Sequence, residues 1–203
     1  PYYVHRAEAQ LAMINREPEK AFDHARQAAE LGPGTKAWYN LAYNHVNSNR
    51  PMASIEALHQ MDPEREPMKG WYSYHAVMAR SHHAVGDYDA EMAVIQDAME
   101  KYPDRRGTMV MLARNLGATG QLDALEDLFR KAQAEPATGA GNTAGALMII
   151  AAAELSVHGQ PEAGAALYQR AVDWYAQAGE AVSAPVHQTW RTMALAAVHD
   201  FDQ

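Results

Sequence analysis

The chain of 203 residues contains no cysteine. Disulfide bonds, thiolate zinc sites and thiol catalysis are therefore excluded, although the absence of cysteine does not identify the redox compartment. Phenylalanine is scarce, with 3 residues, whereas alanine dominates the hydrophobic 48% of the chain. Small side chains let helices approach one another closely, so this composition indicates a protein built from tightly packed helices.

Long apolar runs and excess positive charge are also missing. The longest mostly apolar stretch, residues 144–155, has about 12 residues and includes Glu154, whereas a helix needs about 20 to span a bilayer. Lys and Arg number 17 against 25 Asp and Glu, which gives a formal net charge of −8. No transmembrane helix is predicted, and neither nucleic acid nor an acidic membrane is expected as a partner.

Common catalytic motifs are absent from the sequence. It has no Gly-rich phosphate loop, no H-E-x-x-H pair and no G-x-S-x-G elbow. Several glutamates are expected on exposed helix faces, where they form no evident catalytic pair: Glu8, Glu17, Glu19, Glu30 and Glu126. We therefore predict that the chain is not an enzyme, and we assign no catalytic residue, cofactor or metal ligand.

What the chain does contain is a repeat. Gly86-Asp87-Tyr88 is followed by Ala98, and Gly120-Gln121-Leu122 is followed by Ala132. The two glycines are 120 − 86 = 34 residues apart, and the two alanines 132 − 98 = 34. A period of about 34 residues is typical of a unit that consists of two helices joined by a turn.

The chain resembles the tetratricopeptide repeat (TPR) family. Trp38-x-x-Leu41-Ala42 matches the first half of the family's unit, and Gly86-Asp87-Tyr88 with Ala98 and Pro103 matches the second half. Gly120, Leu122, Phe129 and Ala132 match it again. His45 and His82 depart from the family's preference for Tyr. The resemblance implies an all-α fold, a right-handed superhelix of antiparallel helix pairs (an α-solenoid).

The resemblance also implies how the chain is divided. We expect a single TPR-like repeat domain over residues 1–203, with units at about 2–34, 35–67, 68–105, 106–140 and 144–180, and the first helix of a further unit at 185–198. The chain is also similar to repeat tails of bacterial signalling proteins such as kinases and transcriptional activators. A cytoplasmic bacterial protein is therefore expected, of which this chain is a fragment.

In this architecture the first helix of each unit lines a concave groove. The residues that fall on that side and are not needed for packing are Arg6, Gln10, Tyr39, Tyr43, Asn47, Arg80, His83 and Arg114. Tyr and Arg are typical of recognition surfaces. We predict a protein-interaction scaffold that binds a partner protein or peptide segment there. In the alternative, Tyr39 and Tyr43 only pack between units and the arginines neutralise nearby acids.

Two other interpretations stay open. A small-ligand or metal sensor, or an enzyme, would use His75, His82 and His83. However, His75 and His82 lie two helical turns apart, about 10 Å, which is too far for both to reach one zinc ion. A homodimer is the second alternative, because aromatic residues exceed what packing between units requires: Tyr2, Tyr3, Trp71, Tyr72, Tyr74, Trp174 and Tyr175.

Overall fold

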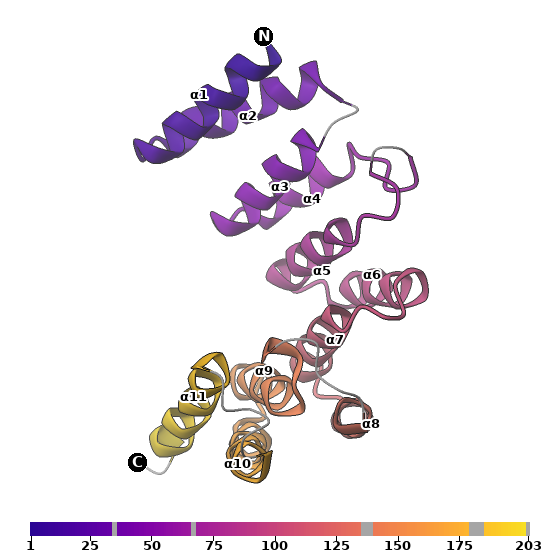
Figure 1. The fold of residues 1–203 in the computed structure, drawn as a ribbon, viewed down its shortest axis with the longest axis vertical. Helices are drawn as coiled ribbons and strands as arrows, with labels where there is room; N and C mark the ends of the chain where they lie inside the picture. The colour runs from indigo at the N-terminus through magenta and orange to yellow at the C-terminus, as the bar shows by residue number, and fades with distance from the viewer. Residues whose placement is uncertain (34–35, 66–67, 135–139, 179–184, 202–203) are drawn as a thin grey trace. The chain divides into compact units, whose positions relative to one another are not determined.

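A computed structural model describes residues 1–33, 36–65, 68–134, 140–178 and 185–201. These residues form eleven α-helices and one short 3-10 helix, and they contain no β-strand (Figure 1). The helices belong to two compact units, residues 1–102 and 103–203. The predicted all-α class is therefore confirmed.

The first unit contains six helices that follow one another as three pairs. They are α1 (Tyr2–Ile14), α2 (Pro18–Leu31), α3 (Ala37–Asn47), α4 (Pro51–Leu58), α5 (Ser73–Val85) and α6 (Tyr88–Lys101). Each helix packs on the next one along the chain, and α3 also packs on α5.

The second unit contains the other five α-helices and the short 3-10 helix. They are α7 (Gly107–Ala118), α8 (Leu122–Ala134), η1 (Ala140–Asn142), α9 (Ala144–Val157), α10 (Pro161–Ala178) and α11 (Pro185–Phe201). The first helices of successive pairs pack together, because α9 lies against both α7 and α11.

The turn inside each pair has one conformation, repeated five times. A left-handed residue follows the first helix: Arg16, Asn49, Gly86, Gly120 or Gly159. The next N–H then donates to a carbonyl five residues earlier, as from Glu17 to Ala12, at N···O distances of 2.9–3.0 Å. This is the Schellman type of helix ending. Three of the second helices then begin with proline, which needs no hydrogen-bond acceptor at the first helical position.

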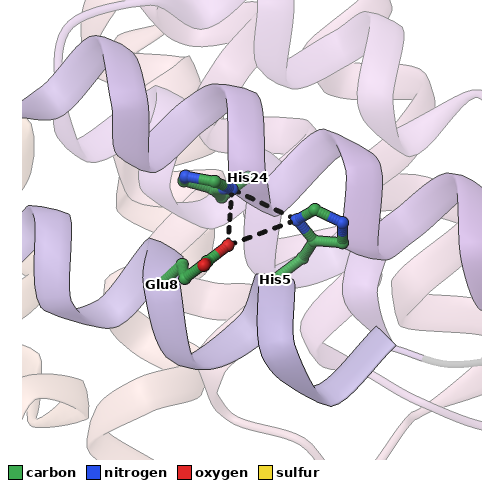
Figure 2. Close-up of side chains that lie close together, drawn as sticks. All are labelled: His5, Glu8 and His24. Atoms are coloured by element: carbon green, nitrogen blue, oxygen red, sulfur yellow. Dashed lines mark hydrogen bonds and ion pairs between the residues drawn. The ribbon is translucent and has the colours of Figure 1, made fainter. Parts of the chain in front are cut away.

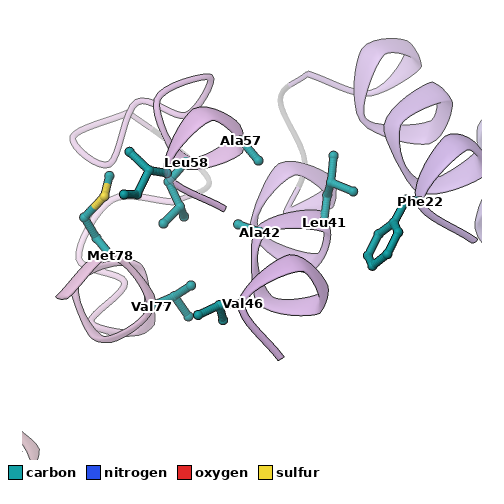
Figure 3. Packing of buried hydrophobic residues seen from close by; sticks show 9 residues of the cluster. Phe22, Leu41, Ala42, Val46, Ala57, Leu58, Val77 and Met78 are labelled. Carbon is teal, nitrogen blue, oxygen red and sulfur yellow. The ribbon is translucent and has the colours of Figure 1, made fainter. Parts of the chain in front are cut away.

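The core of the first unit crosses the helix pairs. Phe22 of α2, Leu41 of α3, Leu58 of α4 and Val77 of α5 belong to one buried apolar cluster (Figure 3). The i, i+1, i+5 spacing of Leu41, Ala42 and Val46 places a buried stripe on α3. Because neighbouring pairs share this cluster, a pair cannot move without opening apolar surface.

In the second unit, α9 is the central helix. Nine of its residues are buried, from Ala144 to Leu155, as expected for a helix that is apolar on all sides. Glycines let its neighbours come close: a Cβ on Gly117 of α7 would lie 2.8 Å from the carbonyl oxygen of Ala151, and one on Gly164 of α10 would lie 2.8 Å from that of Ala152. The apolar stretch is therefore a buried helix of the fold.

The expected single domain, its unit limits and the superhelical arrangement stay predictions. The limits placed at residues 34–35, 67 and 180 lie outside the described residues. Within the described part of the chain, no helix has both the length and the apolar character needed to cross a membrane.

The turn geometry predicts that Arg16→Gly stabilises the first unit. Arg16 has φ 60° and Asn49 has φ 56°, and this region is unfavourable for a residue with a Cβ by about 1–2 kcal/mol, least so for Asn. After the larger unfolded-state entropy of Gly is subtracted, Arg16→Gly should raise the free energy of unfolding by about 0.5–1 kcal/mol. Asn49→Gly should raise it less. Urea denaturation measures both, and a loss of stability in Arg16→Gly would contradict the assignment of the turn.

Because helices approach α9 closely, we predict that Gly→Ala substitutions on α7 and α10 lower the stability of the second unit. In an open helix, Gly→Ala stabilises by about 1 kcal/mol. Gly117→Ala and Gly164→Ala should instead destabilise the second unit by about 1–3 kcal/mol, because each new methyl group meets backbone atoms. Thermal unfolding followed by circular dichroism checks the sign, and a gain in stability in either variant would show that the helices are farther apart.

His45 predicts a pH dependence of stability. Its ring stacks on Phe22 with centroids 4.4 Å apart, and burial lowers its pKa, as do the nearby Arg50 and Arg26, against smaller opposite effects of Glu19 and Glu56. The unfolded chain therefore binds a proton more readily than the folded chain. This contribution to stability is complete above the unfolded pKa of about 6.5 and is lost as the pH falls through the folded pKa.

The matched variant is His45→Phe, which keeps a ring on Phe22 and removes the titrating group. Its free energy of unfolding should fall less than that of the unmodified protein when the pH is lowered from about 7.5 to 5.5, measured by urea denaturation at each pH. Equal losses would mean that His45 is protonated in the folded state as easily as in the unfolded chain.

Candidate functional site

A groove of about 550 Å³ lies between the first helices of the first two pairs. Helix α1 lines it with Arg6, Gln10 and Met13, and helix α3 lines it with Asn40, Tyr43 and Asn44, together with other residues of α1, α2 and α3. The spacing explains this arrangement, because side chains three, four and seven residues apart share one face of a helix. Leu41 follows Asn40 directly, so it lies about 100° around α3 from it, and it is buried in the core.

The groove has a distinct chemical character. Carboxamides line it at Gln10, Asn40 and Asn44, and each of these offers both hydrogen-bond donors and an acceptor. Arg6 is the one charged residue among the described residues that line the groove. Its guanidinium carbon lies 5.6 Å from the centre of the Tyr2 ring. The remaining lining residues besides Tyr43 are alanines, Met13 and Ile14. The site therefore suits a ligand that has both apolar and polar groups, with a negative charge for Arg6.

Three of the eight predicted site residues meet in this groove, namely Arg6, Gln10 and Tyr43. Tyr43 is 46% exposed. Asn47 lies one helical turn beyond Tyr43, and its Oδ1 accepts a hydrogen bond from Nη1 of Arg80 on α5 at 2.8 Å. Asn47 and Arg80 are both exposed, so they extend the polar face of α3 towards α5.

Tyr39 takes a packing role. Its ring centre lies 4.3 Å from that of Trp71, and 6.1 Å from that of Tyr43. Burial raises the pKa of its hydroxyl, an effect partly offset by a hydrogen bond with Ser73. Tyr39 therefore holds the segment before α5 against α3, which is the alternative that the sequence left open for the two tyrosines.

The two remaining predicted residues contact acids of their own units. Nδ1 of His83 lies 2.9 Å from Oε2 of Glu91, which is buried on α6. In the second unit, Nε of the half-buried Arg114 lies 3.9 Å from Oε1 of Glu154 on α9. The structure therefore gives both side chains intramolecular partners and places neither in the groove between α1 and α3.

The histidines of α5 contact separate carboxylates. Nε2 of His75 lies 2.7 Å from Oδ2 of Asp97, and Nδ1 of His82 lies 3.6 Å from Oδ2 of Asp87. With His83 beside Glu91, the three imidazoles belong to three different pairs. Among the described residues, they are not part of a group of three or more ligand atoms lying within 4.8 Å of one another.

A second hollow, of about 330 Å³, lies between α2 and α4 and was not predicted from the sequence. Four of its charged residues form two pairs: Arg50 donates to both carboxylate oxygens of Glu19, and Arg26 lies 2.9 Å from Asp23. Glu56 also lines the hollow. The hydrogen bond from Arg50 lowers the pKa of Glu19. Both arginines of the hollow are therefore already paired within the protein, so the hollow offers an acidic ligand less than the groove does.

Most of the aromatic residues that suggested a homodimer pack inside their own unit. Tyr72 contacts the edge of Tyr102 with ring centres 5.7 Å apart, and Trp174 contacts Tyr175 at 5.0 Å. The hydroxyl groups of Tyr175 and Thr143 share a hydrogen bond of 3.2 Å. Tyr3 is different, since it is 78% exposed. The homodimer stays a prediction, with Tyr3 as the aromatic residue best placed to contribute.

Asn40 and Asn44 line the groove but were not among the predicted site residues. The signal was present, because Asn44 follows Asn40 by four residues and therefore lies on the same face of α3. Comparison with protein-family models gave no match, and comparison with curated proteins gave no significant match either.

Proposed function

We propose that the chain is a protein-interaction scaffold that binds an extended, acidic peptide segment in the groove between α1 and α3. The observation that carries the proposal is the lining of this groove, in which carboxamides stand beside Arg6 and an exposed tyrosine. This combination fits a peptide better than it fits an apolar small molecule.

The carboxamides match the backbone of an extended chain. A peptide in that conformation presents an unpaired N–H and C=O at every residue, and both must be satisfied when water is removed. Gln10 on one side of the groove and Asn40 and Asn44 on the other offer donors and acceptors from two helices. A segment lying between α1 and α3 would therefore exchange hydrogen bonds to water for hydrogen bonds to protein.

The positive charge of Arg6 favours the binding of acidic segments. Among the described residues of the lining, Arg6 is charged and no carboxylate is present, although the whole chain has a net charge of −8. Arg can donate two parallel hydrogen bonds to a carboxylate. Arg80 lies farther along the same side, where it already bonds Asn47, and would meet a second acid only by extending that network.

The scaffold would bind with little reorganisation. Ala12 of α1 and Leu41 and Ala42 of α3 are buried, so the two helices are held by the core. A site on rigid helices loses less conformational entropy on binding than one on loops.

The TPR-like reading of the fold belongs to the same proposal. Two observations support it. The same turn conformation occurs in five helix pairs, and the first helices of neighbouring pairs pack on each other, as α3 does on α5 and α9 on α11. A right-handed superhelix of such pairs would bring the first helices to one side. We place this module in a cytoplasmic bacterial protein.

The test begins with peptides selected against the purified chain from a random displayed library. Fluorescence anisotropy then measures their dissociation constants. Tyr43→Ala should weaken binding about 10- to 30-fold, because an exposed tyrosine in the groove supplies contact area at low entropy cost. Arg6→Gln should weaken the binding of acidic peptides. It should leave nearly unchanged the binding of analogues in which Asn and Gln replace the peptide's acidic residues.

The matched control is Tyr3→Ala, which removes an exposed tyrosine of α1 that does not line the groove. It should leave the affinity within about twofold. If Tyr3→Ala weakens binding and Tyr43→Ala does not, the recognition surface is the exposed side of α1 and the groove assignment is wrong.

A further inference from the structure

Two histidines and a glutamate converge where α1 meets α2, outside the groove. Figure 2 shows the three side chains, His5 and Glu8 from α1 and His24 from α2, pointing towards one another. Within the described ranges, this is the one group of three or more His, Asp or Glu side chains whose ligand atoms all lie within 4.8 Å of one another.

We propose that His5, Glu8 and His24 bind a first-row divalent transition-metal ion such as Zn²⁺, which links α1 to α2. The ligands would be the Nδ1 atoms of both imidazoles and Oε2 of the carboxylate. Two imidazoles and one carboxylate form a recognised ligand set for Zn²⁺.

The distances carry the proposal. The two Nδ1 atoms lie 3.1 Å apart, and Oε2 of Glu8 lies 3.1 Å from Nδ1 of His24 and 3.5 Å from Nδ1 of His5. Ligands about 2.0–2.1 Å from a tetrahedral zinc ion are separated from one another by about 3.3–3.4 Å. The three atoms therefore have the spacing of one face of a coordination tetrahedron, and rotation of the two rings would direct both Nδ1 lone pairs at the ion.

The helices explain why the site is preformed. His5 and Glu8 are three residues apart and share one face of α1, while His24 is presented by the adjacent helix. The ring centroids lie 5.4 Å apart, with planes inclined by 29°, and the Nδ1 atoms lie 3.1 Å apart, so the Nδ1 edges of the two rings face each other. Without a metal ion, a hydrogen bond joins the two Nδ1 atoms. A metal ion would take the place of that hydrogen bond.

Access and charge also fit an ion from solution. The side chains of His5, Glu8 and His24 are 25%, 45% and 30% exposed, so an ion can enter without unfolding of the helices. Neutral imidazoles with one carboxylate give the ligand set a charge of −1, which partly compensates a divalent cation. The remaining coordination positions would hold water.

The test is titration calorimetry with Zn²⁺ on the full chain without an affinity tag. One ion should bind per chain, and both Glu8→Gln and His24→Gln should weaken binding more than about 100-fold, since even indirect partners of a metal cost 10- to 100-fold. Nitrogen NMR of the side chains should show zinc at Nδ1 of His5 and His24.

The control is His158→Gln, which removes a histidine that also lies beside a glutamate, with Nε2 3.5 Å from Oε2 of Glu154. It should bind Zn²⁺ as the unmodified chain does. Circular dichroism confirms that each variant is folded. The proposal is overturned if the unmodified chain binds no Zn²⁺, if Glu8→Gln and His24→Gln bind it unchanged, or if the Nδ1 resonances do not move. Peptide binding in the groove is a separate property, because Glu8 and His24 do not line it.

Discussion

The hydrogen bond that closes each intrapair turn is the constraint on which the helix pairs depend. In every pair an N–H donates to a carbonyl five residues earlier, across one residue with positive φ. That geometry ends the first helix and starts the second within about three residues, so the chain must reverse immediately. Once the reversal is fixed, the apolar faces of the two helices can meet only on each other and on the neighbouring pair.

The proposed sites follow from this reversal. It leaves α1 and α3 with one face in the core and another in solvent, and the groove forms between the solvent faces of these two helices. It also brings His24 of α2 beside His5 and Glu8 of α1, which are 19 and 16 residues earlier in the chain. A peptide site between pairs and a metal site within a pair are therefore compatible on the same scaffold.

The helices were predictable because their signals are local. Pro18 and Pro51 stand at helix starts, Gly86 and Gly120 stand at helix ends, and Leu41 and Ala42 mark a buried face. The left-handed turns at Arg16 and Asn49 carry no glycine, yet the same pairing geometry imposes them. There the packing of the helices overrides the preference of the residue.

The candidate sites depended on contacts that no local pattern contains. Tyr39 and Tyr43 look equivalent in sequence, but Trp71 packs on Tyr39 and leaves Tyr43 exposed in the groove. Glu8 was expected on a solvent-exposed face, and it is exposed; what the sequence did not indicate is that His24 lies opposite it. To predict such contacts one must know how far one helix is shifted along its neighbour, and that shift is set by the packing of the whole unit.

The proposed function depends on recognition of a peptide by the solvent faces of α1 and α3. The most direct measurement is a map of backbone amide NMR shifts of the chain with and without a selected acidic peptide. If the peptide lies in the groove, the largest shifts should fall on α1 and α3 around Gln10, Asn40 and Tyr43. Shifts concentrated instead around Glu19 and Glu56, in the hollow between α2 and α4, would contradict it.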